Sequence, residues 1–208
     1  MIYEEGILAE LKKIAREFEK EKGVKIVTTH LPVGHAFFDP ESWFIKINWD
    51  LVEEEIYDLG LTEEKEIIEW FKHVLEHEYL HYLFQQQLPV WFEVYPLEYH
   101  IATEMFAYRN DGMPDYIREK QKEEVKEDLW HLITFKIVDI EDIRKLVNHI
   151  TFIATKFTRE EIEELIDELN IENTKLARVL RQLHKIKDEF TTPEKAVKLA
   201  KVIRKILE

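Results

Sequence analysis

Strand-like patterns occur only in the first third of this 208-residue chain, and this restricts its fold more than any other feature. Later apolar residues recur at helical spacing in five segments: 115–136, 139–157, 159–169, 173–189 and 193–207. Thr158 and Glu161 have the spacing of a capping box. Asp139 is a predicted N-cap, and Thr192 is a predicted cap before Pro193 at the first helical position. We therefore expect an α+β chain whose C-terminal half is all α.

The first third contains one predicted helix and three predicted strands. The helix covers residues 3–22, and Gly23 stands where a helix commonly ends. Residues 24–29 form the first strand, and two more strands lie between Leu31 and Asp50, joined by a turn at 39–42. One face of the last strand is predicted to pack on a core, and it carries Trp43, Ile45, Ile47 and Trp49. These elements predict a small sheet that ends in a hairpin.

A long predicted helix at 62–87 carries the sequence His77-Glu78-Tyr79-Leu80-His81, which has the form H-E-x-x-H. Positions i and i+4 of a helix lie on one face, about one turn apart. Both imidazoles can therefore bind a single metal ion, with Glu78 beside them. Thr62 is the predicted N-cap of this helix. The spacing indicates the metal-binding helix of a zinc peptidase, and a chance match to so short a motif is the alternative.

His73 extends the histidine series by one more turn. Residues i and i+8 are about 12 Å apart along a helix, whereas zinc–nitrogen bonds are about 2 Å long. One ion therefore cannot bind both His73 and His81. We expect His73 to be a surface residue or to contact a ligand rather than the metal. A third protein ligand must come from elsewhere in the fold.

A break after the long helix separates it from a second, shorter one. Gln-Gln-Gln-Leu-Pro at 85–89 ends the long helix, and an aromatic-rich connection follows at 90–95. Pro96 suits the first position of a helix that continues to about Asp111, where Gly112-Met113-Pro114 stops it. This stop is the predicted boundary between an N-terminal domain at 1–112 and a helical domain at 113–208.

Composition argues against several classes of function. The formal net charge is −14 with no basic stripe, which argues against binding to nucleic acid. The chain has no cysteine, so zinc ligands must be His, Glu or Asp. It has neither a signal-like start nor an uninterrupted run of about 18 apolar residues, so we expect a soluble, cytoplasmic protein that does not bind membranes. Charged residues make up 35% of the chain, Glu, Lys and Ile are abundant, and Asn and Gln are few, which is a bias associated with proteins from hot environments.

The order of elements over about 1–112 resembles the gluzincin metallopeptidases, above all the minigluzincins and more distantly thermolysin. This order is helix, small sheet with hairpin, H-E-x-x-H helix, break and Glu-bearing helix. The resemblance implies a zincin-like fold in which the strand beside the hairpin lines the substrate groove. It also implies that His77 and His81 bind Zn²⁺, that Glu78 is the general base, and that a glutamate on the following helix is the third ligand.

Glu104 is the predicted third ligand. The family often has Glu-x-x-Ala followed by Asp or Asn on this helix, and the nearest match is Glu104-Met105-Phe106-Ala107-Tyr108. Glu93 has no helix to orient it, and Glu98 falls in a first turn, where the helix N-terminus already favours a carboxylate. Glu104 is mid-helix on a partly apolar face, where a carboxylate needs a partner. Glu98 is the next candidate.

Other roles are open to several residues. Tyr108 replaces the family's acidic or amide residue, and Asp111 is a candidate to supply the missing carboxylate beside a ligand imidazole. Tyr108, His100 and Tyr95 are candidates for stabilising the transition state, and Tyr108 is the one we assign as catalytic. Three further histidines are expected on the surface or in ordinary packing: His131, His149 and His184.

We expect a zinc-dependent peptidase that hydrolyses peptide or protein substrates. Zinc would lower the pKa of a bound water towards about 7, and Glu78 would pass its proton to the leaving amine. The helical half would cover, regulate or target the site. The alternative is a helical regulatory or interaction protein with a structural or vestigial zinc site. A closed site has four protein ligands, and His100, one turn before Glu104, is the natural fourth.

Overall fold

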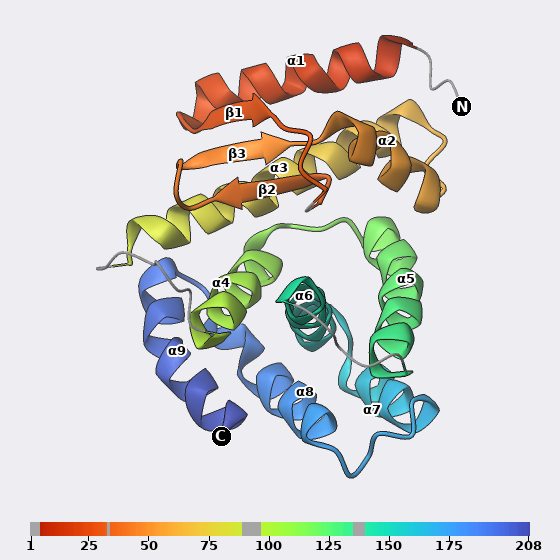
Figure 1. Cartoon of the computed structure of the whole chain (residues 1–208), viewed down its shortest axis with the longest axis vertical. Helices are drawn as coiled ribbons and strands as arrows, with labels where there is room; N and C mark the ends of the chain where they lie inside the picture. Colours follow the sequence, from red (N-terminus) through yellow and green to blue (C-terminus); the bar gives the residue numbers. More distant parts are fainter. Residues whose placement is uncertain (1–4, 33, 89–96, 135–139) are drawn as a thin grey trace. The chain divides into compact units, whose positions relative to one another are not determined.

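The structure is a computed structural model that describes residues 5–32, 34–88, 97–134 and 140–208. Packing divides the chain into two compact units, Met1–Gln85 and Gln86–Glu208. The first unit combines helices with a small sheet, and the second is helical throughout its described residues. Figure 1 labels the elements along the chain.

The described part of the first unit contains three helices and three strands. They follow one another as α1 (Glu5–Lys22), β1 (Lys25–Thr28), β2 (Ala36–Asp39), β3 (Phe44–Ile47), α2 (Trp49–Asp58) and α3 (Glu64–Gln86). The first predicted helix is therefore confirmed from Glu5 onward, and so are the three predicted strands. Gly23 adopts a φ of 71°, a left-handed conformation that ends α1 without strain because glycine has no Cβ.

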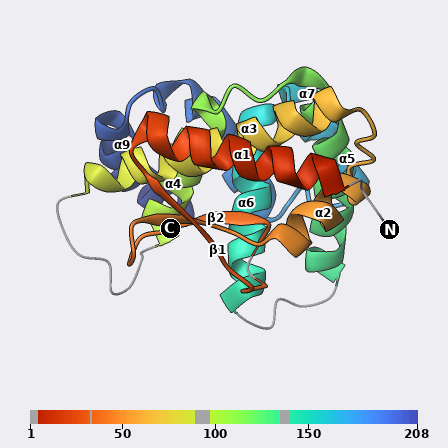
Figure 2. The ribbon, with the colours of Figure 1, turned by 90° about the horizontal axis from the view of Figure 1, so that it is seen from above.

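β3 is the central strand of the sheet, whose order is β1-β3-β2. β1 pairs with β3 in parallel and β2 pairs with it antiparallel, so β1 and β2 are the edge strands of the sheet within the described residues. Ile45 and Ile47 are fully buried, whereas the alternating residues Phe44 and Lys46 are half-buried on the opposite face. Figures 1 and 2 show α1 and α3 on one side of the sheet.

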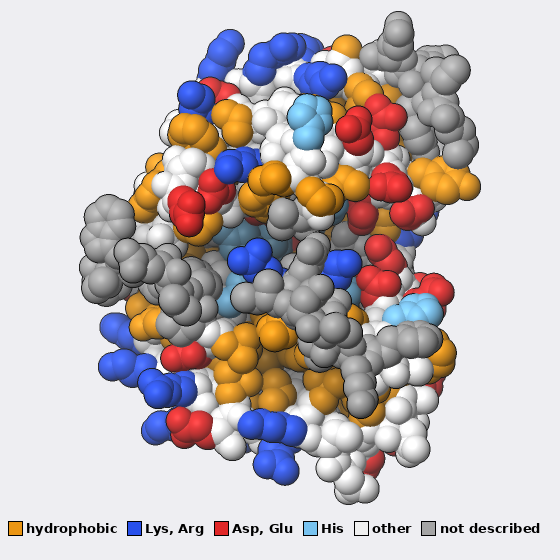
Figure 3. Space-filling view, in the orientation of Figure 1, with side chains coloured by type: hydrophobic (Ala, Val, Ile, Leu, Met, Phe, Trp, Pro, Cys, Tyr) orange, Lys and Arg blue, Asp and Glu red, His pale blue; other side chains and the backbone are white. Residues whose placement is uncertain are grey.

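The face of the sheet turned away from α3 carries lysines over aromatic rings. Lys25 Nζ lies 4.9 Å from the centre of the Phe44 ring, and Lys46 Nζ lies 6.0 Å from that of Phe37. Figure 3 shows apolar side chains gathered over β2 on this face. The lysine side chains cover ring surface that would otherwise meet water, and their charge is attracted to the ring faces.

The core of the first unit draws on all its helices and on β3. Its fully buried members include Leu11, Ile45, Ile47, Ile56, Leu61, Trp70, Phe71 and Leu75. Burial of a side chain the size of Phe71 stabilises a fold by roughly 1.5–3 kcal/mol. Two such rings in the first half of α3, Trp70 and Phe71, therefore fix this helix to the rest of the unit.

Trp43 and Trp49 do not extend β3, contrary to the sequence prediction. Trp43 lies in the hairpin turn with a φ of 63°, and Trp49 begins helix α2. The sequence pattern does not predict α2, because the apolar alternation reaches as far as Trp49. Instead, the side chain of Asn48 accepts a hydrogen bond from the N–H of Asp50 and caps the helix, which ends the strand.

The described part of the second unit is a set of packed helices. They are α4 (Leu97–Asn110), α5 (Asp115–Thr134), α6 (Ile140–Lys156), α7 (Arg159–Glu168), α8 (Lys175–Ile186), the 3₁₀ turn η1 (Lys187–Glu189) and α9 (Pro193–Leu207). The helices predicted from residue 115 onward are confirmed. Thr158 and Glu161 form the predicted capping box, and Thr192 caps α9 just before Pro193. Asp139 lies outside the described residues.

α4 packs mainly against α6 and α9 and so belongs to the helical unit. The observed division at Gln85–Gln86 therefore differs from the predicted domain boundary near residue 112. The end of α4 is tied down by two polar contacts. Asn110 Nδ2 donates to Phe190 O at 2.7 Å, and Lys156 Nζ donates to the buried Asp111 Oδ1 at 2.6 Å. Loss of one partner of such a buried pair is strongly destabilising.

The predicted α+β class is confirmed at the level of a small mixed sheet combined with many helices. The strands that the structure describes all fall in the first unit, as the sequence pattern predicts. Among the helices that the structure describes, none combines the length and the apolar character needed to cross a lipid bilayer.

Candidate metal centre

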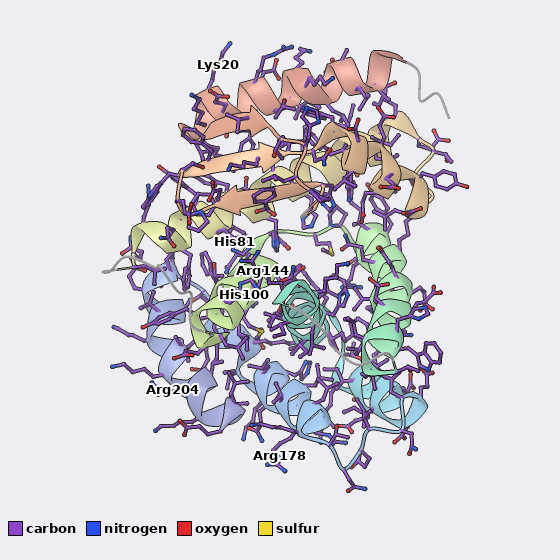
Figure 4. The ribbon with its side chains drawn as sticks, viewed as in Figure 1. Lys20, His81, His100, Arg144, Arg178 and Arg204 are labelled. Carbon is purple, nitrogen blue, oxygen red and sulfur yellow. The ribbon has the colours of Figure 1, made fainter. Side chains whose placement is uncertain are left out.

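Helix α3 carries His77, Glu78 and His81 in its second half. The helix begins at Glu64, two residues later than the predicted N-cap Thr62, so that cap prediction is wrong. Its buried apolar face fixes the helix in the core, and the helical repeat then places both imidazoles on one side of adjacent turns. Figure 4 labels His81 on α3.

The three side chains form a group that could hold a metal ion. Within the described residues, it is the one such group of three or more. Its ligand atoms all lie within 4.8 Å of one another. His77 Nε2 and His81 Nε2 are 3.1 Å apart, and all three side chains are half-buried. The predicted ligand pair and the predicted base are therefore brought together.

The separation of the two nitrogens fits zinc. Two nitrogens at about 2.0–2.1 Å from a tetrahedral Zn²⁺ lie roughly 3.3 Å apart. The observed 3.1 Å also allows one neutral imidazole to donate a hydrogen bond to the other. Metal binding would replace that hydrogen bond by two coordinate bonds and would require both rings to be neutral. Two imidazoles with an adjacent carboxylate thus suit a divalent metal such as zinc.

His73 lies one turn before His77 and is buried, with 8% of its surface exposed. The prediction that His73 is a surface residue is therefore wrong. The rings of His73 and His77 meet edge-to-face, with centres 6.3 Å apart. A buried imidazole against the imidazole of a candidate ligand agrees with the other prediction, in which His73 contacts a ligand rather than the metal.

Glu78 is bonded to the edge strand β2. The backbone N–H of Phe38 donates to Glu78 Oε2 at 2.6 Å, across 40 residues of sequence. Hydrogen bonds to an ionised carboxylate are among the short and strong ones in proteins. The sequence does not predict this partner, because no local pattern shows which backbone group of a distant strand will reach a helix.

Three aromatic rings join the hairpin to α3 beside this bond. Phe38, Trp43 and Tyr82 lie edge-to-face in all three pairings, with centres 5.9 to 6.4 Å apart. Tyr82 follows His81 directly. Edge-to-face rings gain about 0.5–1.5 kcal/mol beyond the burial of their surface. The rings therefore hold the tip of the hairpin against the helix that carries the candidate ligands.

Asp39 stabilises the turn that holds Trp43 in its left-handed conformation. Its carboxylate accepts hydrogen bonds from Ser42 Oγ at 2.6 Å, Glu41 N–H at 3.0 Å and Lys46 Nζ at 2.6 Å. Burial alone would raise the pKa of Asp39, but the bonds from Lys46, Ser42 and Glu41 together outweigh it and lower that pKa below its ordinary value. The φ of 63° at Trp43 is strained for a residue with a large side chain, and these bonds offset that cost.

The predicted third ligand and the predicted catalytic tyrosine both lie on α4, in the second unit. Glu104 is buried, with 7% of its surface exposed, whereas Glu98 is half-buried. A carboxylate at the depth of Glu104 is costly unless hydrogen bonds, a cation or a metal stabilise its charge. The ring of Tyr108 lies edge-to-face on Phe152 of α6, with centres 5.5 Å apart. The roles of Glu104 and Tyr108 stay predictions.

Asp111 is engaged within the helical unit. Its Oδ1 accepts hydrogen bonds from Lys156 Nζ at 2.6 Å and from the N–H of Met113 at 3.1 Å. These bonds give its carboxylate a structural role at the end of α4. His100, the predicted fourth ligand of a closed site, is half-buried on the same helix. Glu93 and Tyr95 lie outside the described residues.

The remaining histidines of the second unit lie among ordinary surface and packing contacts. His131 is exposed near Glu127, and the side chain of His149 lies 3.4 Å from Asp128. His184 Nδ1 lies 3.0 Å from the carbonyl oxygen of Ala154, and burial lowers the pKa of this imidazole. The case for a metal centre accordingly stands on the three side chains of α3. Comparison with models of known protein families, with curated proteins and with solved structures finds no match to the chain.

Proposed function

We propose that this chain is a zinc-dependent metallopeptidase of the gluzincin type, which hydrolyses peptide bonds in peptide or protein substrates. The observation that carries the proposal is the 3.1 Å separation of His77 Nε2 and His81 Nε2, with the Glu78 carboxylate beside them on the same helix. H-E-x-x-H chemistry needs these groups: two neutral imidazoles for a metal and one carboxylate for a proton.

Each of the three residues has a distinct part in the proposed reaction. His77 and His81 hold the metal through their Nε2 atoms. Zinc, when bound, supplies a Lewis acid that polarises the scissile carbonyl and makes water nucleophilic near neutral pH. Glu78 accepts the proton of the attacking water and delivers it to the leaving amine. No covalent intermediate with the protein is required.

We further propose that the substrate binds as an extended chain along the edge strand β2. β2 pairs on one side only among the described strands, and its Phe38 N–H lies at the candidate base. An edge strand can accept an added strand through its outward backbone groups. The resemblance to gluzincins, in which the strand at this point of the chain lines the substrate groove, agrees with this proposal.

The rest of the proposed site follows from the sequence. Glu104 is the proposed third ligand, and Tyr108 on the same helix is the proposed group that stabilises the transition state. Glu98 is the next candidate, because it lies in the first turn of α4, where the helix N-terminus already favours a carboxylate. The remainder of the helical unit would cover, regulate or target the site.

The proposal is tested by separating metal binding from chemistry at Glu78. In the Glu78→Gln variant we expect zinc content and thermal stability close to wild type, while hydrolysis of a mixed-sequence peptide library falls about 100-fold or more. Glu76→Gln is the matched control. It lies two residues earlier on α3 and pairs with Lys22 at 3.3 Å, away from the proposed chemistry. Mass spectrometry of the library detects cleavage at any sequence, so the preferred substrate does not have to be identified first.

Three results would count against the proposal. Peptide cleavage by the Glu78→Gln variant at the wild-type rate would exclude Glu78 as the base. Wild-type protein that carries zinc but cleaves no peptide would favour the alternative, a helical regulatory protein with a structural zinc site. Protein that binds no zinc even when zinc is added would leave the motif as a chance match.

A further inference from the structure

The backbone of β2 presents two kinds of N–H group. Asn48 N–H bonds to His35 O, so His35 and Asn48 form a hydrogen-bonded pair of the antiparallel ladder. The register pairs Phe37 with Lys46, and alternation then makes this the next hydrogen-bonded pair. The N–H groups of Ala36 and Phe38 consequently face away from β3. Phe38 uses this outward N–H for Glu78 Oε2, at 2.6 Å.

We propose that the Phe38 N–H is a positioning group for Glu78. This inference rests on the proposed peptidase function. The bond fixes Oε2 of the Glu78 carboxylate at the edge strand and so orients the whole carboxylate. One hydrogen bond thereby sets the distance between the base on α3 and the strand along which an extended substrate would lie. Phe38 acts through Glu78 and does not itself touch the reacting atoms.

The surroundings of Phe38 keep this bond in register. Its ring lies on the face of the sheet towards α3, beside its buried cross-strand partner Ile45. The ring also meets that of Tyr82 edge-to-face, with ring centres 5.9 Å apart. Trp43 completes the ring contacts from the turn, which the Asp39 carboxylate holds closed. A slip of β2 by one residue would turn the Phe38 side chain to the other face and carry its N–H towards β3. Side-chain packing thus decides which N–H reaches Glu78.

The bond itself can be tested without any measurement of activity. Backbone amide exchange, followed by NMR, reports the protection of each N–H. In Glu78→Ala we expect the Phe38 amide to exchange about tenfold faster or more, because a hydrogen bond to a charged group is lost. The amide of Phe37, which bonds within the ladder, should keep its protection. Equal protection of Phe38 in wild type and Glu78→Ala would overturn the inference.

Proline tests the role of the bond in catalysis, because it removes the N–H and is tolerated on an edge strand. We expect Phe38→Pro to lower kcat about 10-fold to 100-fold, with KM and zinc content little changed, since misplacement of a catalytic group acts on the chemical step. Ala36→Pro removes the other outward N–H of β2 and measures the general effect of proline in this strand. Its loss of kcat should be much smaller. Phe38→Ala separates loss of the ring from loss of the N–H.

The outcomes distinguish this inference from the proposed function. If wild-type protein cleaves peptides and Phe38→Pro loses no more kcat than Ala36→Pro, the positioning role is wrong and the peptidase proposal stands. If wild-type protein binds zinc and cleaves nothing, the proposed function fails and the positioning role fails with it, whatever the exchange result. A loss of zinc in Phe38→Pro alone would also overturn the inference, because the bond would then serve metal binding.

Discussion

His77 Nε2 and His81 Nε2 lie 3.1 Å apart on adjacent turns of α3. Neither ring needs to move far to place both nitrogens at about 2.0–2.1 Å from one tetrahedral ion. The helix supplies this relationship by itself, because residues four apart share a face. A site of this kind needs little ordering when the metal binds, so it should bind its metal as a folded protein rather than fold around it.

The first prediction concerns metal content. We expect wild-type protein to bind about one zinc per chain, and His77→Ala and His81→Ala each to lose most of it. The loss of zinc affinity should exceed the 10–100-fold decrease that is usual when a residue that only orients a ligand is mutated. His30→Ala is the control, because His30 is a strongly exposed histidine of the same unit, near Asp50. Elemental analysis and zinc titration would measure the effect. Equal zinc binding by His77→Ala and wild type would rule out this pair as ligands.

The second prediction names the third ligand. Glu104→Ala should weaken zinc binding far more than Glu98→Ala, because we assign the buried carboxylate on α4, and not the half-buried one, to the metal. Thermal unfolding with and without zinc would check that each variant still folds. We expect zinc to raise the unfolding temperatures of wild type and Glu98→Ala by a similar amount, and that of Glu104→Ala much less. If Glu98→Ala is the variant that sheds zinc, the assignment of Glu104 is wrong.

The third prediction concerns pH and the hairpin. Hydrogen bonds from Lys46, Ser42 and Glu41 more than offset the effect of burial and lower the pKa of Asp39. Its ionised form therefore stabilises the folded state. That contribution is fully present above the ordinary pKa of about 3.9 and is lost as the pH falls through the lowered pKa. Asp39→Asn should lower the free energy of unfolding at pH 7 by about 1–3 kcal/mol.

The pH dependence separates Asp39 from a general effect of charge. Between about pH 5 and pH 2, wild-type protein should lose more stability than Asp39→Asn does, because the variant has no such proton to take up. Denaturant unfolding at several pH values would measure both curves. Asp58→Asn, at an exposed position of the same unit, is the control and should follow wild type. Parallel curves for wild type and Asp39→Asn would contradict the prediction.

Local patterns predicted the elements that depend on neighbours in sequence. The capping box of Thr158 and Glu161 and the cap at Thr192 are confirmed, because each is completed within one helical turn. The predicted extension of β3 to Trp43 and Trp49 is wrong, because two local patterns compete at these positions. An alternating apolar pattern continues there, but the Asn48 cap and the turn closed by Asp39 decide the backbone instead. Short-range competition between two patterns cannot be resolved from apolar periodicity alone.

Long-range contacts lay beyond the sequence. Nothing local shows that α4 packs with α6 and α9, or that His73 is buried rather than exposed, because burial depends on which elements cover a surface. The parallel pairing of β1 with β3 is also a long-range contact. β2 lies between these two strands in sequence, but in the sheet it lies on the far side of β3. Such choices are made by the packing of side chains that are distant along the chain.

The sequence by itself determined the pair His77 and His81, because helical spacing alone places two residues four apart on one face. It also determined that Glu78 lies beside them. Only the tertiary structure decided where the Glu78 carboxylate is held. Its partner is a backbone N–H of Phe38, 40 residues away, and backbone groups carry no residue-specific signal in a sequence. Which N–H faces outward depends on strand register, and register is set by the packing of the whole sheet against α3.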